Sequence, residues 1–338
     1  MTPSFVLEVA TLSYDELMFI RLFAVLIACA LSSASVLAAF PEKPVRIVVP
    51  FSPGGGTDLV ARTMAPAMAQ ELGQAVLVEN KPGASTILGT DFVAKSLPDG
   101  YTLVMATLAH VVNPTMQAKL PYSHATAFAS VMLVGRSPNV LVVRVDGPLK
   151  SVKDILVAAR QTPGRLTFAS QGAGTSAHLA GELFKSIAKV DLIHVAYKGA
   201  GPALTDVIGG QVDMMFATAA AVGSLIDAGK LRALAVTTAQ RSTTPDLAKI
   251  PTIAESGVVG YEADSWYGLF APAGTPAAVI ERLNAAAKKA VQSDAFKARV
   301  ASEGLIVSGG SAQEFDRYAK EQELRWRKVI KDANISLD

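Results

Sequence analysis

Short runs rich in β-branched residues alternate with amphipathic helical patterns along most of this 338-residue chain. One helical pattern places apolar residues at a four-residue step from Val60 to Leu72, and Pro66 within it predicts a kink. Strand–helix alternation on this scale predicts an α/β fold with parallel, doubly wound sheets and helices on both faces. The candidate strands are Val45–Val49, Ala75–Val78, Thr102–Met105, Val131–Val134, Val140–Val143, Leu166–Phe168, Leu192–Val195, Val212–Phe216, Leu231–Val236 and Tyr267–Phe270.

Two glycine-rich junctions each follow a predicted strand and precede a helical pattern. The first has the sequence PGGGTD at 53–58, and the second has GAGTS at 172–176. A helix that starts after such a turn points unpaired N–H groups and its positive dipole end at an anion. In doubly wound folds the ligand lies beyond the carboxyl ends of the strands, where both junctions fall. The pair predicts a protein that holds an acid rather than transforms one.

The N-terminal segment has the pattern of a secretory leader. Arg21 precedes the apolar run Leu22–Leu31, and small residues follow. We predict a signal peptide over 1–38, with Met18 as the alternative true start. The apolar run is shorter than the roughly 20 residues needed to span a bilayer, and no later segment approaches that length. The mature protein is therefore expected to be soluble and periplasmic.

The only cysteine, Cys29, lies inside this predicted leader. The residues LIAC at 26–29 also match a lipoprotein cleavage box, so anchoring at Cys29 is the alternative to plain cleavage. Under plain cleavage the mature chain has no disulfide, thiol nucleophile or thiolate metal site. Only 18% of residues are charged and the net charge is +2, which argues against a nucleic-acid-binding or disordered chain.

The length of the mature chain, about 300 residues, exceeds one ordinary hydrophobic core and predicts two lobes. We assign 39–143 and 264–338 to the first lobe, and 144–263 to the second. The chain would then cross between the lobes twice, near 136–144 and near 263–266. Two crossings predict a cleft with a hinge.

No catalytic signature is found in the sequence. Gly56 is followed by Thr57 and Asp58, not by the lysine of a P-loop. A dinucleotide fingerprint begins at Gly172, but Ala177 stands where its third glycine is needed. A serine nucleophile elbow is absent, and the four histidines show no metal-ligand spacing. We therefore expect no enzyme activity, no cofactor and no metal.

Three positions near the junctions have a local and a functional interpretation. Asp58 lies where an acid caps the first turn of a helix, and this is compatible with a role in a site. His178 lies one helical turn beyond the second junction. The sequence YKG at 197–199 follows a strand end, where it supplies either a phenol and a cation or only a turn before the next helix.

A series of short motifs, in a fixed order along the chain, resembles one family closely. The mature chain resembles the periplasmic solute-binding proteins of tripartite tricarboxylate transporters, often called the Bug family. The matching segments are PEKPVRIVVPF at 41–51, PGGGTD at 53–58, ENKPGA at 79–84, PDGYTL at 98–103, GAGTSAH at 172–178, YKG at 197–199, PTIAESG at 251–257 and WYGLFAPAGTP at 266–276.

The resemblance implies a two-lobed Venus-flytrap fold, type II-like, with a doubly wound sheet in each lobe. It implies capture of a mono-, di- or tricarboxylate and delivery to separate membrane permease subunits, by a protein that we expect to be a monomer. In this family loop amides, hydroxyls and ordered waters hold the carboxylate more than a salt bridge does. The predicted ligand-binding residues are Phe51, Ser52, Gly55, Gly56, Thr57, Asp58, Ser85, Thr86, Thr107, Ser170, Gly172, Gly174, Thr175, Ser176, His178 and Tyr197.

Two departures from the family pattern concern specificity. Ser85 and Thr86 stand where family members commonly have glycines, and Ala196 stands where proline is common. Two other functions stay open at this point. One is a receptor that senses a ligand for a signalling partner, and the other is an exported enzyme acting on an organic acid.

Overall fold

The computed structural model describes residues 40–117, 119–242, 244, 247–301, 304–332 and 335. The predicted signal peptide and Cys29 lie outside the described residues. The chain divides into a unit of residues 1–42 and a unit of residues 43–338. Only residues 40–42 of the first unit are described, and they are not part of a helix or strand. The architecture below is that of residues 43–338.

The second unit, residues 43–338, starts with the strands and helices of one half of the sheet. Three parallel strands, β1 (Val45–Val49), β2 (Val76–Asn80) and β3 (Thr102–Ala106), lie in the order β2-β1-β3, and β3 pairs with β9. The helices α2 (Gly56–Leu72), α3 (Ile87–Ala94) and α4 (Leu108–Met116) follow these strands one by one. α2 continues through Pro66, and its apolar stripe from Val60 to Leu72 is buried as predicted.

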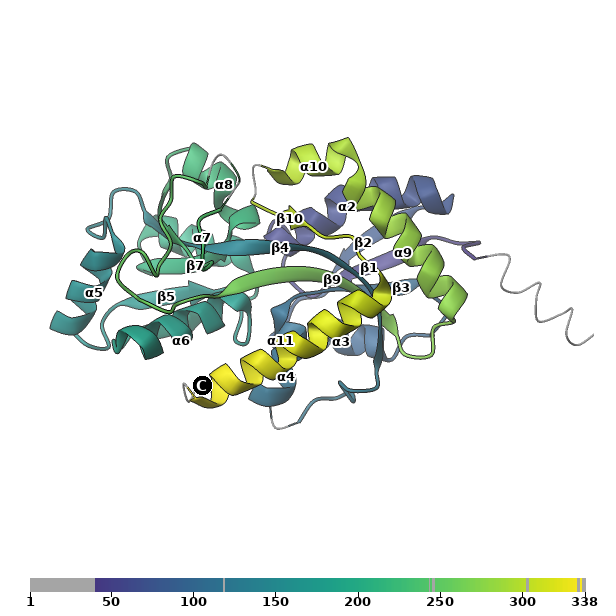
Figure 1. Cartoon of the computed structure of the whole chain (residues 1–338), viewed down its shortest axis with the longest axis horizontal. Helices are drawn as coiled ribbons and strands as arrows, with labels where there is room; N and C mark the ends of the chain where they lie inside the picture. The colour runs from purple at the N-terminus through teal and green to yellow at the C-terminus, as the bar shows by residue number, and fades with distance from the viewer. Residues whose placement is uncertain are drawn as a thin grey trace, which may run out of the picture. The chain divides into compact units, whose positions relative to one another are not determined.

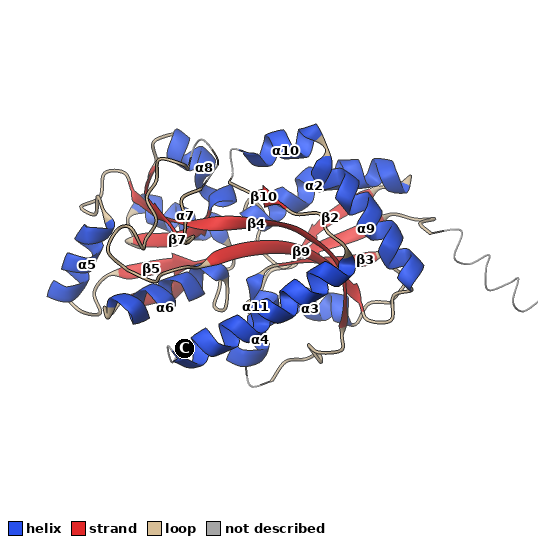
Figure 2. Cartoon of the chain, viewed as in Figure 1, coloured by secondary structure: helices blue, strands red, loops and turns tan. Residues whose placement is uncertain are grey.

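Two antiparallel strands connect the halves of the sheet, β4 (Phe128–Arg144) and β9 (Asp264–Pro272), which lie side by side in Figures 1 and 2. Residues 128–138 of β4 pair with β9, whereas residues 139–144 pair with β7 (Met214–Thr218) and β8 (Leu231–Val236). The prediction of two strands, 131–134 and 140–143, was therefore wrong. The polar residues between them resemble a turn, but they remain in extended pairing as the strand passes from one half to the other.

The other half of the sheet has β5 (Thr167–Ser170) between β6 (Ile193–Ala196) and β7, all parallel. Helices α5 (Val152–Gln161), α6 (Ser176–Ala188), α7 (Ala200–Gly209) and α8 (Ala219–Asp227) flank these strands. Ser151 is the N-cap of α5, because its hydroxyl accepts a hydrogen bond from the Asp154 N–H at 3.1 Å.

The C-terminal segment returns to the first half. α9 (Ala277–Gln292) packs on α2, and α11 (Ala312–Asp332) packs on α4 and β4, with α10 (Asp294–Ala301) and β10 (Ile306–Val307) between them. The two-residue strand β10, which sequence patterns did not indicate, pairs antiparallel with β4. The sheet is therefore mixed, since the parallel prediction holds within each half but not for β4, β8, β9 and β10. Among the described residues no helix has the length and apolar character needed to cross a membrane.

Candidate functional site

The loop after β1 is shaped by the carboxylate of Asp58. Its Oδ2 accepts from the Gly54 N–H at 3.0 Å, and its Oδ1 accepts from Asn80 Nδ2 at 2.9 Å. Arg62 Nε donates to the same carboxylate at 3.0 Å. Burial raises the pKa of Asp58, but the hydrogen bonds from Arg62, Gly54 and Asn80 outweigh it and lower that pKa. Asp58 thus stays ionised and holds the glycine turn at the start of α2.

Four helices begin around one small cavity, which we call the central cavity. α2 begins at Gly56 and α7 at Ala200, and the N-cap residues of α4 and α8 are Thr107 and Thr218. Neither threonine uses its side chain to cap its own helix, so both hydroxyls are available to the cavity. The ten lining residues are Phe51, Gly55, Gly56, Thr57, Thr107, Gln171, Ala200, Thr218, Ser265 and Tyr267.

The chemistry of this lining favours an anion without a cationic side chain. None of the ten lining residues is Lys, Arg or His. Each helix N-terminus carries about half a positive elementary charge on its unpaired N–H groups. Hydroxyls of Thr57, Thr107 and Ser265 add donors that can turn toward a carboxylate oxygen. The arrangement replaces the hydration of an anion with fixed dipoles.

The two halves of the sheet meet closely beside the central cavity. The Ser52 N–H and its Oγ donate to the Lys198 carbonyl oxygen at 3.2 Å and 2.9 Å. A Cβ atom placed on Gly55 would lie 3.4 Å from the Cβ of Ala200. The cavity has a volume of about 10 Å³, which is space for roughly one water molecule. The structure is therefore a closed arrangement of the two halves.

Internal hydrogen bonds hold the second glycine junction in its turn. Ser170 Oγ donates to the Gly172 carbonyl at 3.0 Å and lies 2.7 Å from His194 Nε2. Thr175 Oγ1 donates to the same carbonyl at 2.6 Å, and Ser176 Oγ donates to Asn139 Oδ1 at 3.2 Å. These hydroxyls stabilise the loop, while its residue Gln171 lines the central cavity.

His178 acts on this loop as a neutral hydrogen-bond acceptor. Its Nδ1 accepts from the Gly174 N–H at 3.0 Å, and its ring stacks on His194 with centroids 4.0 Å apart. Burial, with smaller contributions from the charges of His194 and Lys185, lowers the pKa of His178 to about 3. His178 does not line the central cavity. Its position supports the turn rather than presenting a positive charge to a ligand.

A strained turn at Ala84, Ser85 and Thr86 faces the second junction. All three have left-handed backbones, with φ of 45°, 52° and 79°, where a Cβ is unfavourable. The buried Asn113 supports the turn by donating from Nδ2 to the Ser85 carbonyl at 3.0 Å and to Thr86 Oγ1 at 3.3 Å. A Cβ on Gly172 would lie 3.9 Å from the Ser85 Cα. Glycine, which has no Cβ, would adopt this backbone at lower cost than the residues present.

Tyr197 presents its backbone, not its phenol, to the junction region. The phenol donates to Asp206 Oδ2 at 2.6 Å, on α7. Burial and this hydrogen bond raise the pKa of Tyr197 to about 12. Its carbonyl oxygen lies 3.5 Å from where a Cβ on Gly172 would be. At Tyr197 the chain therefore contacts the second glycine junction through main-chain atoms and not through the phenol.

Of the residues predicted from sequence, five line the central cavity: Phe51, Gly55, Gly56, Thr57 and Thr107. The others lie in the surrounding loops or at the adjoining ends of α2, β5 and α6, with the contacts given above. Sequence reasoning missed Ala200 and Thr218, although each lies where a strand is followed by a helix, which is the signal that identified Gly56. Ala200 is the first residue of α7, and Thr218 is the last residue of β7 and the N-cap of α8. It also missed the remaining lining residues, Gln171, Ser265 and Tyr267.

Two α/β halves joined by two strands, with helix N-termini around a cavity between them, define a two-lobed solute-binding protein. Residues 60–335 match the model of the tripartite tricarboxylate transporter family receptor, TctC. The chain belongs to this family, and the predicted resemblance and fold class are confirmed.

Similar proteins cover nearly the whole chain. BugT of Bordetella pertussis is 34% identical over 94% of this chain and 98% of its own. The structure of R. palustris Rpa4515 with adipate has 37% identity and a TM-score of 0.84, covering 88% of this chain and 99% of that one. MatC (Rpa3494) from Rhodopseudomonas palustris, with bound malate, has 32% identity and a TM-score of 0.82, covering 86% and 100%.

Proposed function

We propose that this protein captures a small mono-, di- or tricarboxylate in the central cavity and delivers it to the membrane permease of a tripartite transporter. The observation that carries the proposal is the convergence of four helix N-termini on a cavity whose lining has no cationic side chain. Family relatives have adipate and malate in their structures, which supports a carboxylate as the ligand class.

Capture requires the halves to separate. A cavity of about 10 Å³ does not admit a carboxylate of several carbon atoms. We assign 39–143 and 264–338 to one lobe and 144–263 to the other, with the hinge at β4 and β9, because these two strands connect the halves. Ligand then shifts an open–closed equilibrium, since only the closed form brings both sets of helix N-termini to it.

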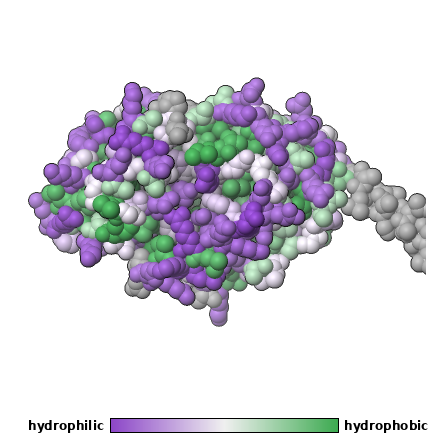
Figure 3. Space-filling view, viewed as in Figure 1, coloured by the Kyte–Doolittle hydropathy of each residue, from purple (hydrophilic) through white to green (hydrophobic). Residues whose placement is uncertain are grey.

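The remaining parts of the proposal concern cellular context. The protein is exported by the signal peptide at 1–38 and acts in the periplasm as a monomer that binds no nucleic acid. Figure 3 shows a face on which hydrophobic residues lie in small, separate patches, as expected where no permanent partner covers the surface. The protein binds its ligand without converting it.

A screen of organic acids tests this function. Thermal-shift measurements identify the acids that raise the melting temperature, and calorimetry then gives the stoichiometry, which we expect to be one. Incubation of protein with each hit, followed by product analysis, should return the acid unchanged. Conversion of the acid, or the absence of any stabilising acid, contradicts the proposal.

A further inference from the structure

A second and larger cavity, of about 270 Å³, lies beside the strands that join the two halves. Its lining includes Arg136 of β4, the loop 238–242, Glu262, and Asp264 of β9. We call it the Arg136 cavity. Successive side chains of a strand point to opposite faces. Ser265 and Tyr267 of β9 line the central cavity whereas Asp264 lines this one, so β9 separates the two.

Two opposite charges line the Arg136 cavity without pairing. Among the described residues, the Arg136 side chain has no ion pair within 4.0 Å and no hydrogen bond. The Asp264 Oδ1 atom is buried and also has no hydrogen-bond partner. Burial raises the pKa of Asp264, while the charges of Arg325 and Arg136 act against that increase. Arg136 is thus near enough to act on Asp264 electrostatically, yet too far to bond to it.

The other charged residues of this cavity already have partners. Arg241 Nε donates to Glu255 Oε2 at 2.9 Å, and Glu262 lies 3.7 Å from an Arg325 nitrogen. Removing a charge from water costs free energy unless a partner of opposite sign replaces the water. The buried Oδ1 of Asp264 is therefore the atom for which an occupant of the cavity would supply a missing partner. Arg136 is exposed, so its guanidinium can bind the opposite charge of that occupant.

We propose that the Arg136 cavity binds a small zwitterion, such as a free amino acid or a betaine. Its carboxylate would accept from the Arg136 guanidinium, and its cationic group would face the Asp264 carboxylate. An anion would pair with Arg136 but add negative charge beside Asp264. A cation would pair with Asp264 but add positive charge beside Arg136. Only a molecule with both charges satisfies both groups.

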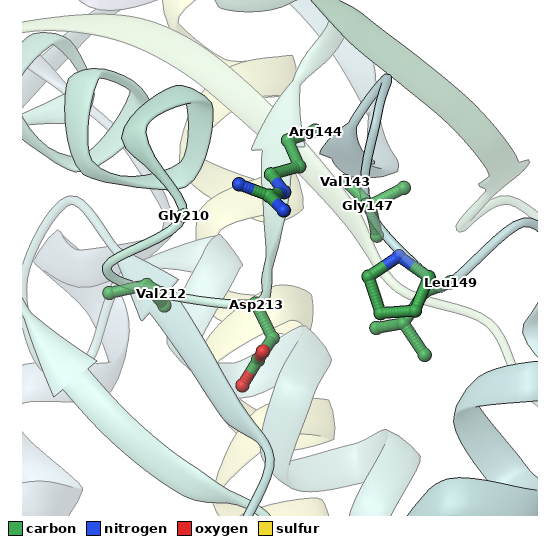
Figure 4. A pocket seen from close by; sticks show the side chains of 8 residues that line it. Val143, Arg144, Gly147, Leu149, Gly210, Val212 and Asp213 are labelled. Atoms are coloured by element: carbon green, nitrogen blue, oxygen red, sulfur yellow. The ribbon is translucent and has the colours of Figure 1, made fainter.

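A pocket at the far end of β4 provides the contrast. It has a volume of about 120 Å³ and is also lined by an arginine and an aspartate, Arg144 and Asp213 (Figure 4). Asp213 Oδ2, however, accepts from the Thr167 N–H and from Thr167 Oγ1, both at 2.8 Å. Its carboxylate is committed to β5, so this pocket lacks a matched pair of unpaired charges. Arg144 is therefore a suitable control for Arg136.

Calorimetry with L-alanine and glycine betaine as probes, and with acetate and methylammonium as single-charge controls, tests the proposal. We expect one zwitterion per protein and weaker or undetectable binding of the single ions. Arg136→Gln and Asp264→Asn should each weaken zwitterion binding at least about tenfold, because each removes one charged contact. Arg144→Gln should bind as the unaltered protein does, and circular dichroism verifies that every variant is folded.

The variant Thr107→Val separates this site from the proposed carboxylate site. It removes a hydroxyl from the central cavity without added bulk, so the halves can still close and zwitterion binding should be intact. A zwitterion that is lost in Thr107→Val but retained in Arg136→Gln occupies the central cavity, which overturns the proposal. The same holds if neither zwitterion binds, if acetate binds equally well, or if Arg144→Gln weakens binding as much as Arg136→Gln. If the organic-acid screen finds no ligand, the zwitterion measurements can still be interpreted, because they use different probes and different variants.

Discussion

Ser52 donates twice to the carbonyl oxygen of Lys198, once from its backbone N–H and once from its hydroxyl. The two residues are 146 positions apart in the chain and belong to loops from opposite halves of the sheet. A main-chain acceptor imposes no side-chain requirement on Lys198. The contact therefore depends on the hydroxyl of Ser52 and on the approach of the two loops.

Ser52→Ala removes one of these donors and should favour the open arrangement. A single hydrogen bond contributes about 0.5–1.5 kcal/mol, so we expect affinity for the carboxylate to fall by roughly two- to tenfold. Small-angle scattering should show a smaller decrease in radius of gyration on ligand addition than in the unaltered protein. Ser96→Ala removes a hydroxyl that donates to the Phe92 carbonyl just beyond the end of α3, so it is the control and should leave affinity unchanged. An unaltered protein whose radius stays constant at saturating ligand would contradict domain closure.

Gly55→Val should abolish closure while leaving the fold intact. Gly55 has an extended backbone, with φ of −89° and ψ of 170°, which a β-branched residue also adopts. Its new side chain would meet Ala200 only when the halves are together. We expect carboxylate affinity to fall more than about tenfold, with less than about 1 kcal/mol change in the free energy of unfolding. Gly209→Ala, in open space on α7, is the control for the added methyl group. If Gly55→Val loses affinity and stability to the same extent, the prediction is wrong and Gly55 has only a structural role.

Ser85→Gly should stabilise the protein. Ser85 has a φ of 52°, and the left-handed conformation costs a residue with a Cβ roughly 1–2 kcal/mol. Glycine avoids that cost but loses more backbone entropy on folding, so the expected net gain is about 0.5–1 kcal/mol in urea unfolding. Ser85→Val should be destabilising because a β-branched side chain fits this conformation worst. A gain with valine would show that the turn is not strained.

His178 should make stability depend on pH between about 3 and 6.5. Its pKa is about 3 in the folded protein, against an ordinary value of 6.5, so the unfolded chain binds the proton more tightly. Stability therefore rises with pH across this window and is fully present above 6.5. His178→Asn keeps an acceptor for the Gly174 N–H without titrating, and it should reduce the loss of stability between pH 7 and pH 5. His178→Ala also removes the titration but leaves that N–H unpaired, so its stability should be lower at both pH values. An unchanged pH dependence in both variants would assign the effect to other groups.

The sequence identified those parts of the fold that local pattern controls. Predicted strands Val45–Val49 and Leu231–Val236 match β1 and β8, and the junction at Gly55 and Gly56 was found because strand, glycines and helix are contiguous. Ser265 and Tyr267 reach the same cavity from an antiparallel strand far along the chain, and no local pattern marks them. The left-handed turn at Ser85 was not foreseen, because tertiary contacts such as those of Asn113 hold it.

Two predicted site residues direct their side chains away from the central cavity, and the cause is shared. His178 and Tyr197 were assigned to the site because each follows a strand–loop junction. Sequence position specifies where a side chain starts, but not the partner toward which it turns. His178 turns toward Gly174 and His194, and the Tyr197 phenol toward Asp206. Such choices depend on which polar groups are buried nearby, and these are known only when the strands are assembled.

The continuity of β4 has a consequence for how the molecule loses its structure. Residues 128–138 pair with β9, and residues 139–144 pair with β7 and β8, within one uninterrupted strand. If the chain is divided near residue 144, neither half retains its full set of strands. A fragment containing only the second half would lack β4, the strand that pairs with both β7 and β8. Heating should accordingly give a single calorimetric transition whose van't Hoff and measured enthalpies agree. Parts that rotate relative to each other in function would thus melt as one.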